Sequence, residues 1–315
     1  GIAPLGDLDG NGLAEVAGSA PFDGNGALWV HFLTGTAGTR VLKSAAPAGL
    51  QALGRSLARL GDLDRDGNPD LAAAARSGSS DVIAILFLNG VGRIERHRTI
   101  LPSELPASAV SQLESAGDFD GDGNTDLLVR SGTGLVYLLF LEADGSPRAT
   151  KVVDLALVPT LDRNRIEDAL LLGREARSGL VGLMLMMSDR QYLLRLDAEG
   201  DVLSAAARNV PARGLVDGVG LGDLDGDGLN DYARLDRTQR RMRIEFLDAL
   251  GQATGEELFG SGRAVSVRAL GDLSGDGVQD LAAMVTPSEE APSHVILFQL
   301  GGTATGGFEH QDNPE

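Results

Sequence analysis

Four aspartates lie close together in a short segment near residue 65. The segment GDLDRDGNPDLAAAA, residues 61–75, contains Asp62, Asp64, Asp66 and Asp70. Carboxylates at such spacing repel one another unless something neutralises them. Numbered from the first aspartate, these side chains stand at positions 1, 3, 5 and 9, and Gly67 stands at position 6. Glycine adopts positive φ without steric cost, so the loop can fold back and bring its odd-numbered side chains to one point.

This arrangement favours a calcium site. Four side-chain oxygens and the backbone carbonyl of position 7 supply about five hard ligands, and Ca²⁺ takes roughly 6–8 oxygens. Mg²⁺ takes fewer protein ligands in a tighter octahedron. An EF-hand is excluded because it needs a bidentate glutamate at position 12, where this segment has Ala73. A simple turn with solvated carboxylates is the alternative reading of a single copy.

Recurrence of the pattern argues against that alternative. Five copies begin at residues 7, 62, 118, 223 and 272, and each has glycine at position 6. We therefore expect about five Ca²⁺ ions per chain. The predicted ligands are side chains at positions 1, 3, 5 and 9 and the carbonyl at position 7: Asp7, Asp9, Asn11, Leu13 and Glu15; Asp62, Asp64, Asp66, Asn68 and Asp70; Asp118, Asp120, Asp122, Asn124 and Asp126; Asp223, Asp225, Asp227, Leu229 and Asp231; Asp272, Ser274, Asp276, Val278 and Asp280.

A degenerate copy occupies residues 160–168. Arg165 stands where the others have the glycine of position 6, and Pro159 replaces the glycine that precedes the loop. We expect this loop not to bind an ion. The first and last functional copies each contain one neutral side chain, Asn11 and Ser274, and should bind more weakly.

The six motif copies recur about every 53 residues, and other features recur with them. An apolar run such as VIAILFL or LVYLLFL follows each motif and ends at a glycine-rich or acidic turn. Such runs predict strands, and their continuous apolarity predicts sheets covered on both faces. Repeats of this length predict a single all-β domain over residues 1–315, a β-propeller of six visible four-stranded blades, or seven in the native protein. The expected blades are approximately residues 1–52, 53–107, 108–153, 154–212, 213–262 and 263–315.

Composition limits the possible partners. The 315 residues carry a formal net charge of −18, which argues against nucleic acid or an anionic membrane as partner. There is no cysteine, so disulfides and thiolate metal sites are excluded. No apolar run is long enough to span a bilayer, so we expect no membrane insertion. The sequence starts at Gly1 without a signal-type segment, and we expect it to be part of a larger chain.

The repeats resemble FG-GAP repeats, the calcium-binding blades of the integrin α-subunit propeller and its bacterial relatives. The segments LGRSLARLGDLDRDGNPDLAAAA and LFGSGRAVSVRALGDLSGDGVQDLAA carry the glycine-rich lead-in, the DxDxDGxxD loop and the apolar strand of that family. The resemblance implies that the loop joins the first two strands of a blade and that its calcium is structural. Integrin propellers have seven blades, whereas six motifs are visible here.

No catalytic constellation is visible. The four histidines are scattered, and strand positions explain them better than catalysis does. Trp29 stands in an apolar run and is expected in the core. The cluster RTQRRMR, residues 237–243, is expected to be a solvated edge rather than an anion site. We therefore expect a non-enzymatic, calcium-stabilised binding or adhesion module of a secreted or cell-surface protein, with a protein or glycan ligand at a propeller face. The alternative is a lectin or a polysaccharide-lyase-type enzyme on the same calcium propeller.

Overall fold

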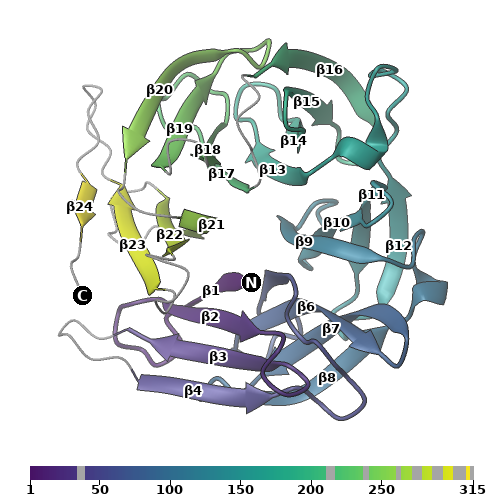
Figure 1. The fold of residues 1–315 in the computed structure, drawn as a ribbon, viewed down its shortest axis with the longest axis vertical. Coiled ribbons are helices and arrows are strands. Elements are labelled where there is room, and N and C mark those ends of the chain that lie inside the picture. Colours follow the sequence, from purple (N-terminus) through teal and green to yellow (C-terminus); the bar gives the residue numbers. More distant parts are fainter. Residues whose placement is uncertain are drawn as a thin grey trace. The chain divides into compact units, whose positions relative to one another are not determined.

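Six antiparallel sheets of four strands each make up the computed structural model of this chain (Figure 1). It describes residues 1–33, 40–210, 217–236, 241–259, 264–271, 279–285, 294–300 and 310–312. The chain divides into two compact units, residues 1–153 and 154–315, which are described separately. Their boundary coincides with the predicted boundary between the third and fourth blades, and the expectation of a single domain stays a prediction.

Unit 1 contains the first three sheets, each a meander in chain order. The strands of the first sheet are β1 (Ile2–Gly6), β2 (Glu15–Ala20), β3 (Ala27–Phe32) and β4 (Arg40–Ala45). Those of the second are β5 (Leu57–Gly61), β6 (Asp70–Ser77), β7 (Ser80–Leu88) and β8 (Ile94–Ile100). Those of the third are β9 (Val110–Gly117), β10 (Asp126–Ser131), β11 (Val136–Leu141) and β12 (Pro147–Val152). The first strands are neighbours, with β5 in contact with both β1 and β9.

Unit 2 contains the other three sheets. The strands of the fourth are β13 (Asp168–Arg174), β14 (Val181–Met186), β15 (Arg190–Leu196) and β16 (Val202–Asn209). Those of the fifth are β17 (Gly218–Gly222), β18 (Asp231–Asp236), β19 (Arg241–Leu247) and β20 (Ala253–Phe259). Those of the sixth are β21 (Ala264–Gly271), β22 (Asp280–Val285), β23 (His294–Leu300) and β24 (His310–Asp312). Here too the first strands are neighbours, with β17 in contact with β13 and β21.

The prediction of an all-β propeller fold with four-stranded blades is confirmed. Five sheets have four strands of at least five residues, whereas the sixth ends on the three-residue strand β24. Five of the six predicted blades are therefore complete, and the sixth has only a three-residue fourth strand. A seventh sheet does not occur among the described residues.

The helices within the described ranges are short connections. They are the 3₁₀ turns η1 (Pro102–Glu104) and η2 (Arg163–Arg165). No helix in the described part of the chain is long and apolar enough to cross a membrane.

The continuous apolar runs are explained by sheets that are covered on both faces. In β6, Leu71, Ala73 and Ala75 pack into a core shared with the first sheet. Ala72 and Ala74, which alternate with them, pack into the core shared with the third sheet. All five side chains are fully buried. Alternate residues of one strand thus serve two cores, so the strand carries no polar face.

A repeated irregularity places the acidic loop at the end of the first strand. In the second sheet the register shifts between Arg59 and Gly61, and Gly61 pairs with Asp70. This residue pair therefore closes the base of the loop between β5 and β6. The loop joins the first two strands of its blade, as the resemblance to FG-GAP repeats implies. The same shift occurs next to the loop in four further sheets, at Pro4/Gly6, Ser115/Gly117, Gly220/Gly222 and Ala269/Gly271. A β-bulge of this kind bends the strand and increases its twist.

The degenerate copy departs from this plan. Asp168 opens the first strand of its sheet, β13, whereas the corresponding acidic residues of the other copies open a second strand. Its loop therefore precedes the sheet and does not connect two of its strands. The apolar segment after this loop contributes Asp168–Arg174 to the strand β13.

Close approach of neighbouring first strands gives a testable prediction. A Cβ atom on Gly220 of β17 would lie 2.4 Å from the carbonyl oxygen of Leu171 and 2.7 Å from Cα of Leu172, both in β13. Because these are backbone atoms, Gly220→Ala must push the two sheets apart, and we expect it to lower the free energy of unfolding by about 2 kcal/mol or more.

The matched control is Gly255→Ala in β20, where the nearest atom to the new Cβ, a ring carbon of Phe246, lies at 3.4 Å. Urea unfolding of both variants measures the difference. Equal effects of the two substitutions would contradict the close packing of the sheets.

Candidate metal centres

Four acidic loops each bring three carboxylates together. Within each cluster, one ligand oxygen from every residue lies within 4.8 Å of the others, a spacing that can hold a metal ion. The loops connect β1 to β2, β5 to β6, β9 to β10 and β17 to β18. The clusters are Asp7, Asp9 and Glu15; Asp62, Asp64 and Asp66; Asp118, Asp120 and Asp122; Asp223, Asp225 and Asp231.

The carboxylate at position 1 organises the backbone of its loop. Asp118 accepts hydrogen bonds from the amides of Gly121 at 2.8 Å and Gly123 at 3.0 Å, which are positions 4 and 6. Asp223 accepts the equivalent pair of bonds from Gly226 and Gly228, both at 2.8 Å. The loop therefore wraps around its first carboxylate, as the sequence pattern predicts.

Position 4 also requires positive φ, which the sequence analysis missed. Three of the four loops have glycine there, and the second has Arg65 at φ +63°. The signal was present in the repeated DGDG and DGNG sequences. Arg65 also reaches the third sheet, where its guanidinium donates to the side-chain oxygen of Asn124 at 3.4 Å. A non-glycine residue in this conformation is strained, so the second loop tolerates a cost that the others avoid.

The buried acid at position 9 accepts hydrogen bonds from both the loop and the third strand, and we call it the position-9 brace. Asp70 accepts from the amide of Leu63 in the loop at 2.9 Å and from the amide of Leu88 at the end of β7 at 3.3 Å. Asp126 and Asp231 make the same two types of bond. The loop geometry is thereby tied to the sheet behind it. In the second and third loops the three-carboxylate cluster consists of positions 1, 3 and 5, without this residue.

Burial sets the electrostatics of these braces. Removal from water is the main reason why the pKa of Asp70, Asp126 and Asp231 is raised to about 7; the amide hydrogen bonds lower it and the neighbouring loop carboxylates raise it, and the value of about 7 includes both effects. Burial likewise raises the pKa of Glu15. The loops therefore hold negative charge at a cost that a nearby cation would offset.

Two carboxylate oxygens show that the loops fit a cation. Oε1 of Glu15 and Oδ1 of Asp120 are buried and accept no hydrogen bond from the described residues. Glu15 itself is fully buried, and its other oxygen accepts from the amide of Leu8 at 2.5 Å. Buried acceptors without a donor are rare in folded proteins because each one loses its hydration. Oxygen-only donor sets of this kind suit hard cations such as Ca²⁺.

Several predicted ligands remain untested. Asp272, Ser274, Asp276 and Val278 lie outside the described residues, while Asp280 is described and accepts from the amide of Leu300 at 2.7 Å. The position-7 residues Leu13, Asn68, Asn124 and Leu229 lie in their loops, and the role of their carbonyls stays a prediction.

Residues 160–168 adopt a different local structure. Asp162 caps the 3₁₀ turn η2 by accepting from the amide of Asn164 at 3.0 Å. Arg165 pairs with Asp189 at 2.8 Å, and Asp168 accepts from the amide of Gly218 at 2.9 Å. Asp162 and Asp168 therefore accept hydrogen bonds from different parts of the chain. Neither belongs to the three-carboxylate clusters found among the described residues.

The expectation of a solvated edge for RTQRRMR is wrong at Arg243, which is buried in β19. Residues 237–240 of this cluster lie outside the described residues. Nearby, the buried Glu245 pairs with both Arg208 and Arg234 and accepts from the hydroxyl of Tyr232 at 2.7 Å. Sequence alone does not reveal this network, because its members come from three strands of two sheets. All four histidines lie in strands, as expected. Trp29 of β3 is only partly buried, so the expectation that it lies in the core is not met.

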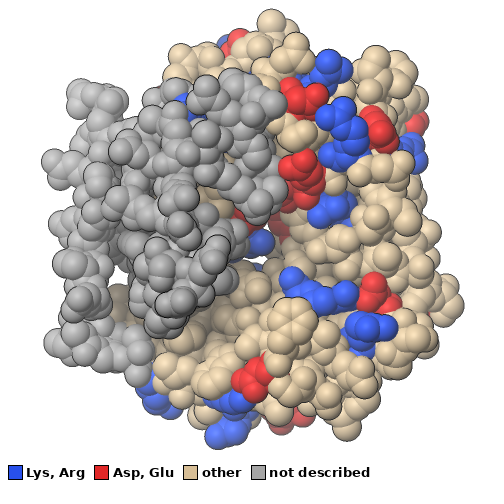
Figure 2. Space-filling model, in the orientation of Figure 1, with Lys and Arg blue, Asp and Glu red and all other residues tan. Residues whose placement is uncertain are grey.

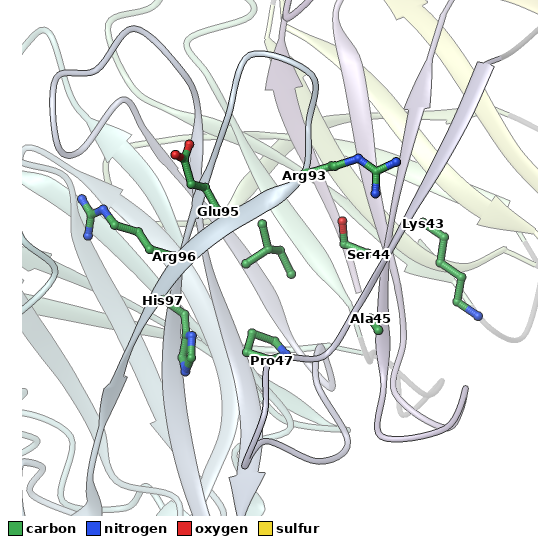
Figure 3. A pocket seen from close by; sticks show the side chains of 9 residues that line it. Lys43, Ser44, Ala45, Pro47, Arg93, Glu95, Arg96 and His97 are labelled. Carbon is green, nitrogen blue, oxygen red and sulfur yellow. The ribbon is translucent and has the colours of Figure 1, made fainter.

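A surface recess of about 300 Å³ lies between β4 and β8 (Figure 3). Two of its basic residues are already paired, since Lys43 contacts Asp23 at 2.5 Å and Arg96 contacts Asp64. In the close-up the side chains of Lys43 and Arg96 point away from its centre. Figure 2 likewise shows acidic and basic side chains interspersed on the visible face. The loops are therefore the stronger candidate site.

Comparison with known proteins supports the repeat and the fold. Residues 62–129 match the FG-GAP-like repeat, which confirms the resemblance for the segment from the second loop to the strand after the third. No curated protein sequence matches the chain.

Among solved structures, the chain is similar to several β-propellers. A PQQ-bound aldose sugar dehydrogenase from Streptomyces coelicolor is 12% identical, with a TM-score of 0.57, over 94% of this chain and 92% of that one. The BP39L lectin from Burkholderia pseudomallei is 13% identical, with a TM-score of 0.54, over 100% and 98%. The WD40 domain of coronin from Toxoplasma gondii is 13% identical, with a TM-score of 0.52, over 99% and 69%. At these identities the likeness concerns the fold alone.

The loop conformation predicts the effect of a single methyl group. Gly67 has φ +90°, and an added Cβ would meet no atom within 4 Å. Gly67→Ala should therefore act only through backbone strain, lowering the free energy of unfolding by about 1–2 kcal/mol. Gly18→Ala in β2 is the control, because its φ is not positive and its new Cβ would make only contacts of 3.9 Å or longer. Urea unfolding in the presence of a chelator measures the free energy of unfolding of both variants. A decrease for Gly18→Ala as large as that for Gly67→Ala would contradict the loop geometry.

Proposed function

We propose that this chain, with an FG-GAP-like repeat in residues 62–129, is a non-catalytic binding module whose blades are stabilised by structural Ca²⁺. The observation that carries the proposal is the repetition of one oxygen-rich cluster in four loops, two of which contain a buried carboxylate oxygen without a donor. A catalytic centre is needed once, whereas a cluster that recurs at the same place in successive sheets serves each sheet. The repetition therefore supports a structural role for the ions.

The residues that would hold each ion are those that the loops bring together. Positions 1 and 3 would contribute in all four described loops, with position 5 or position 9 completing the cluster. A bound Ca²⁺ would supply positive charge to carboxylates that otherwise repel one another, and nothing else. Asp7, Asp62, Asp118 and Asp223 would also keep the loop backbone wrapped, through the amide bonds they accept.

We further propose that the protein works outside the cytosol, at a cell surface or after secretion. Extracellular calcium modules bind the ion at about 10⁻⁴–10⁻³ M, and such sites stay empty at cytosolic calcium levels. A protein or glycan would bind at a face of the module, in an adhesion or recognition role. This part of the proposal rests on the family resemblance and on the net charge of −18, which disfavours nucleic acid.

Calcium removal tests the proposal. Each site held at 100 times its dissociation constant would contribute about 2.7 kcal/mol, because the ion binds the folded loop and not the unfolded chain. Thermal melts in EDTA, in calcium and in sodium chloride of equal ionic strength should show a rise of several degrees with calcium alone. Coincident curves in EDTA and calcium would overturn the proposal.

A pair of variants assigns the effect to the loops. Asp225→Ala removes position 3 of a clustered loop, and Asp162→Ala removes position 3 of the degenerate copy; both side chains are exposed. The calcium-induced rise in melting temperature should shrink in Asp225→Ala and stay unchanged in Asp162→Ala. Equal responses would mean that the ion acts elsewhere.

A further inference from the structure

Two of the acidic loops already contain a positive charge supplied by the fourth strand of their own sheet. Arg96 of β8 pairs with Oδ2 of Asp64, and Arg148 of β12 pairs with Oδ2 of Asp120. Nε of Arg148 also lies 3.2 Å from Oδ2 of Asp122. Both arginines therefore bind position 3 of the loop, which is one of the predicted calcium ligands.

An aromatic ring on the third strand holds each arginine in place. The guanidinium carbon of Arg96 lies 3.3 Å from the centroid of Phe87, its direct partner in the register of β7 and β8. That of Arg148 lies 5.5 Å from the centroid of Phe140 in β11. Cation–π contact with a partly desolvated ring restrains the guanidinium, so it is directed towards the loop rather than into solvent.

The first sheet has the same stacked arginine without the ion pair. Arg40 pairs with Phe32 in the register of β3 and β4, and its guanidinium carbon lies 3.7 Å from the ring centroid. Among the described residues, Asp9, which is position 3 of that loop, makes no ion pair. The stacking is thus shared by three sheets, whereas the contact with position 3 is specific to the second and third.

The loops also differ in formal charge. The second loop contains four carboxylates, Asp62, Asp64, Asp66 and Asp70, and so does the third, whereas the first contains three because Asn11 stands at position 5. Arg148 brings the formal charge of the third loop from −4 to −3, which is the formal charge of the first loop. The second loop also contains Arg65, so Arg96 brings its formal charge from −3 to −2. The loop of Asp223, Asp225, Asp227 and Asp231 has a formal charge of −4 and no ion pair at position 3 among the described residues.

We propose that Arg96 and Arg148 are resident counter-charges that hold the second and third loops together without metal and weaken their affinity for Ca²⁺. The inference rests on the proposed function, since it concerns the same loops. The guanidinium relieves repulsion between the carboxylates of the metal-free loop. The same charge, separated from a bound ion by one carboxylate, repels that ion. Calcium therefore stabilises the folded form of these loops less than it would in the absence of the arginine. A higher calcium concentration is also needed to occupy them.

Hydrogen exchange read loop by loop tests the proposal on the full chain. Peptides covering residues 61–75 report the second loop, and those covering residues 5–18 report the first. Arg96→Met removes the charge and retains much of the aliphatic stem. We expect exchange of the second loop in chelator to become faster, and the calcium concentration that half-protects it to fall by about 3- to 10-fold. The first loop should not change.

Two controls separate charge from packing. Arg40→Met removes the stacked arginine of the first sheet, which makes no ion pair with Asp9 among the described residues, and should leave the calcium midpoint of residues 5–18 within about 2-fold. Arg96→Lys retains the charge without the planar group and should keep the second loop near its parent midpoint. Arg148→Met, read on the third loop, repeats the test if Arg96→Met does not fold.

Each other outcome overturns the inference. A higher calcium midpoint in Arg96→Met means that the arginine positions a ligand. An unchanged midpoint means that the ion pair has no effect on the calcium affinity of the loop. If the parent chain shows calcium protection in its loops but Arg96→Met behaves like the parent, this inference fails and the proposed function stands. If no loop of the parent responds to calcium, the proposed function fails and the inference fails with it.

Discussion

Repulsion between carboxylates at the turn of each blade is the constraint on which the rest of the structure depends. Three acidic oxygens meet within 4.8 Å in each of four loops. The acid at position 9 is buried in all four, and in two of them, as Glu15 and Asp231, it belongs to the cluster. The backbone lowers this cost by donating amides to positions 1, 5 and 9. Backbone amides are dipoles, however, and do not cancel the net charge. A cation must supply the remainder, and the fold offers two sources, an arginine from the fourth strand or an ion from solution.

The position-9 brace connects this electrostatic problem to the sheet. Its two oxygens accept from the loop and from the end of the third strand, as in the bonds of Asp126 to the amides of Phe119 at 3.1 Å and Leu141 at 3.0 Å. Anything that changes the charge of the loop therefore acts on the hydrogen bonding between loop and sheet. Because the second sheet packs against the first and the third through strands buried on both faces, its stability in turn affects the cores on either side.

Sequence reasoning could predict what the repeat encodes locally. The period located the loops, the strands and the acid clusters, because each depends on residues close together in the chain. The sequence period could not reveal the ion pair between Arg96 and Asp64. Arg96 stands 32 residues after Asp64 and reaches it only through the register of β7 and β8. It also missed the network around Glu245 and misplaced Arg243, since burial there depends on how two sheets meet. The short last strand of the sixth sheet likewise has no signal in the repeat.

The most direct test of the central claim is the number of calcium ions bound by the folded chain. Equilibrium dialysis against millimolar calcium, followed by elemental analysis of protein and buffer, gives this number without assumptions about stability. The account predicts about five ions per chain, four in the described loops and one in the copy that begins at residue 272. Fewer than one ion per chain would contradict it, because the carboxylates would then be neutralised by protons and arginines alone.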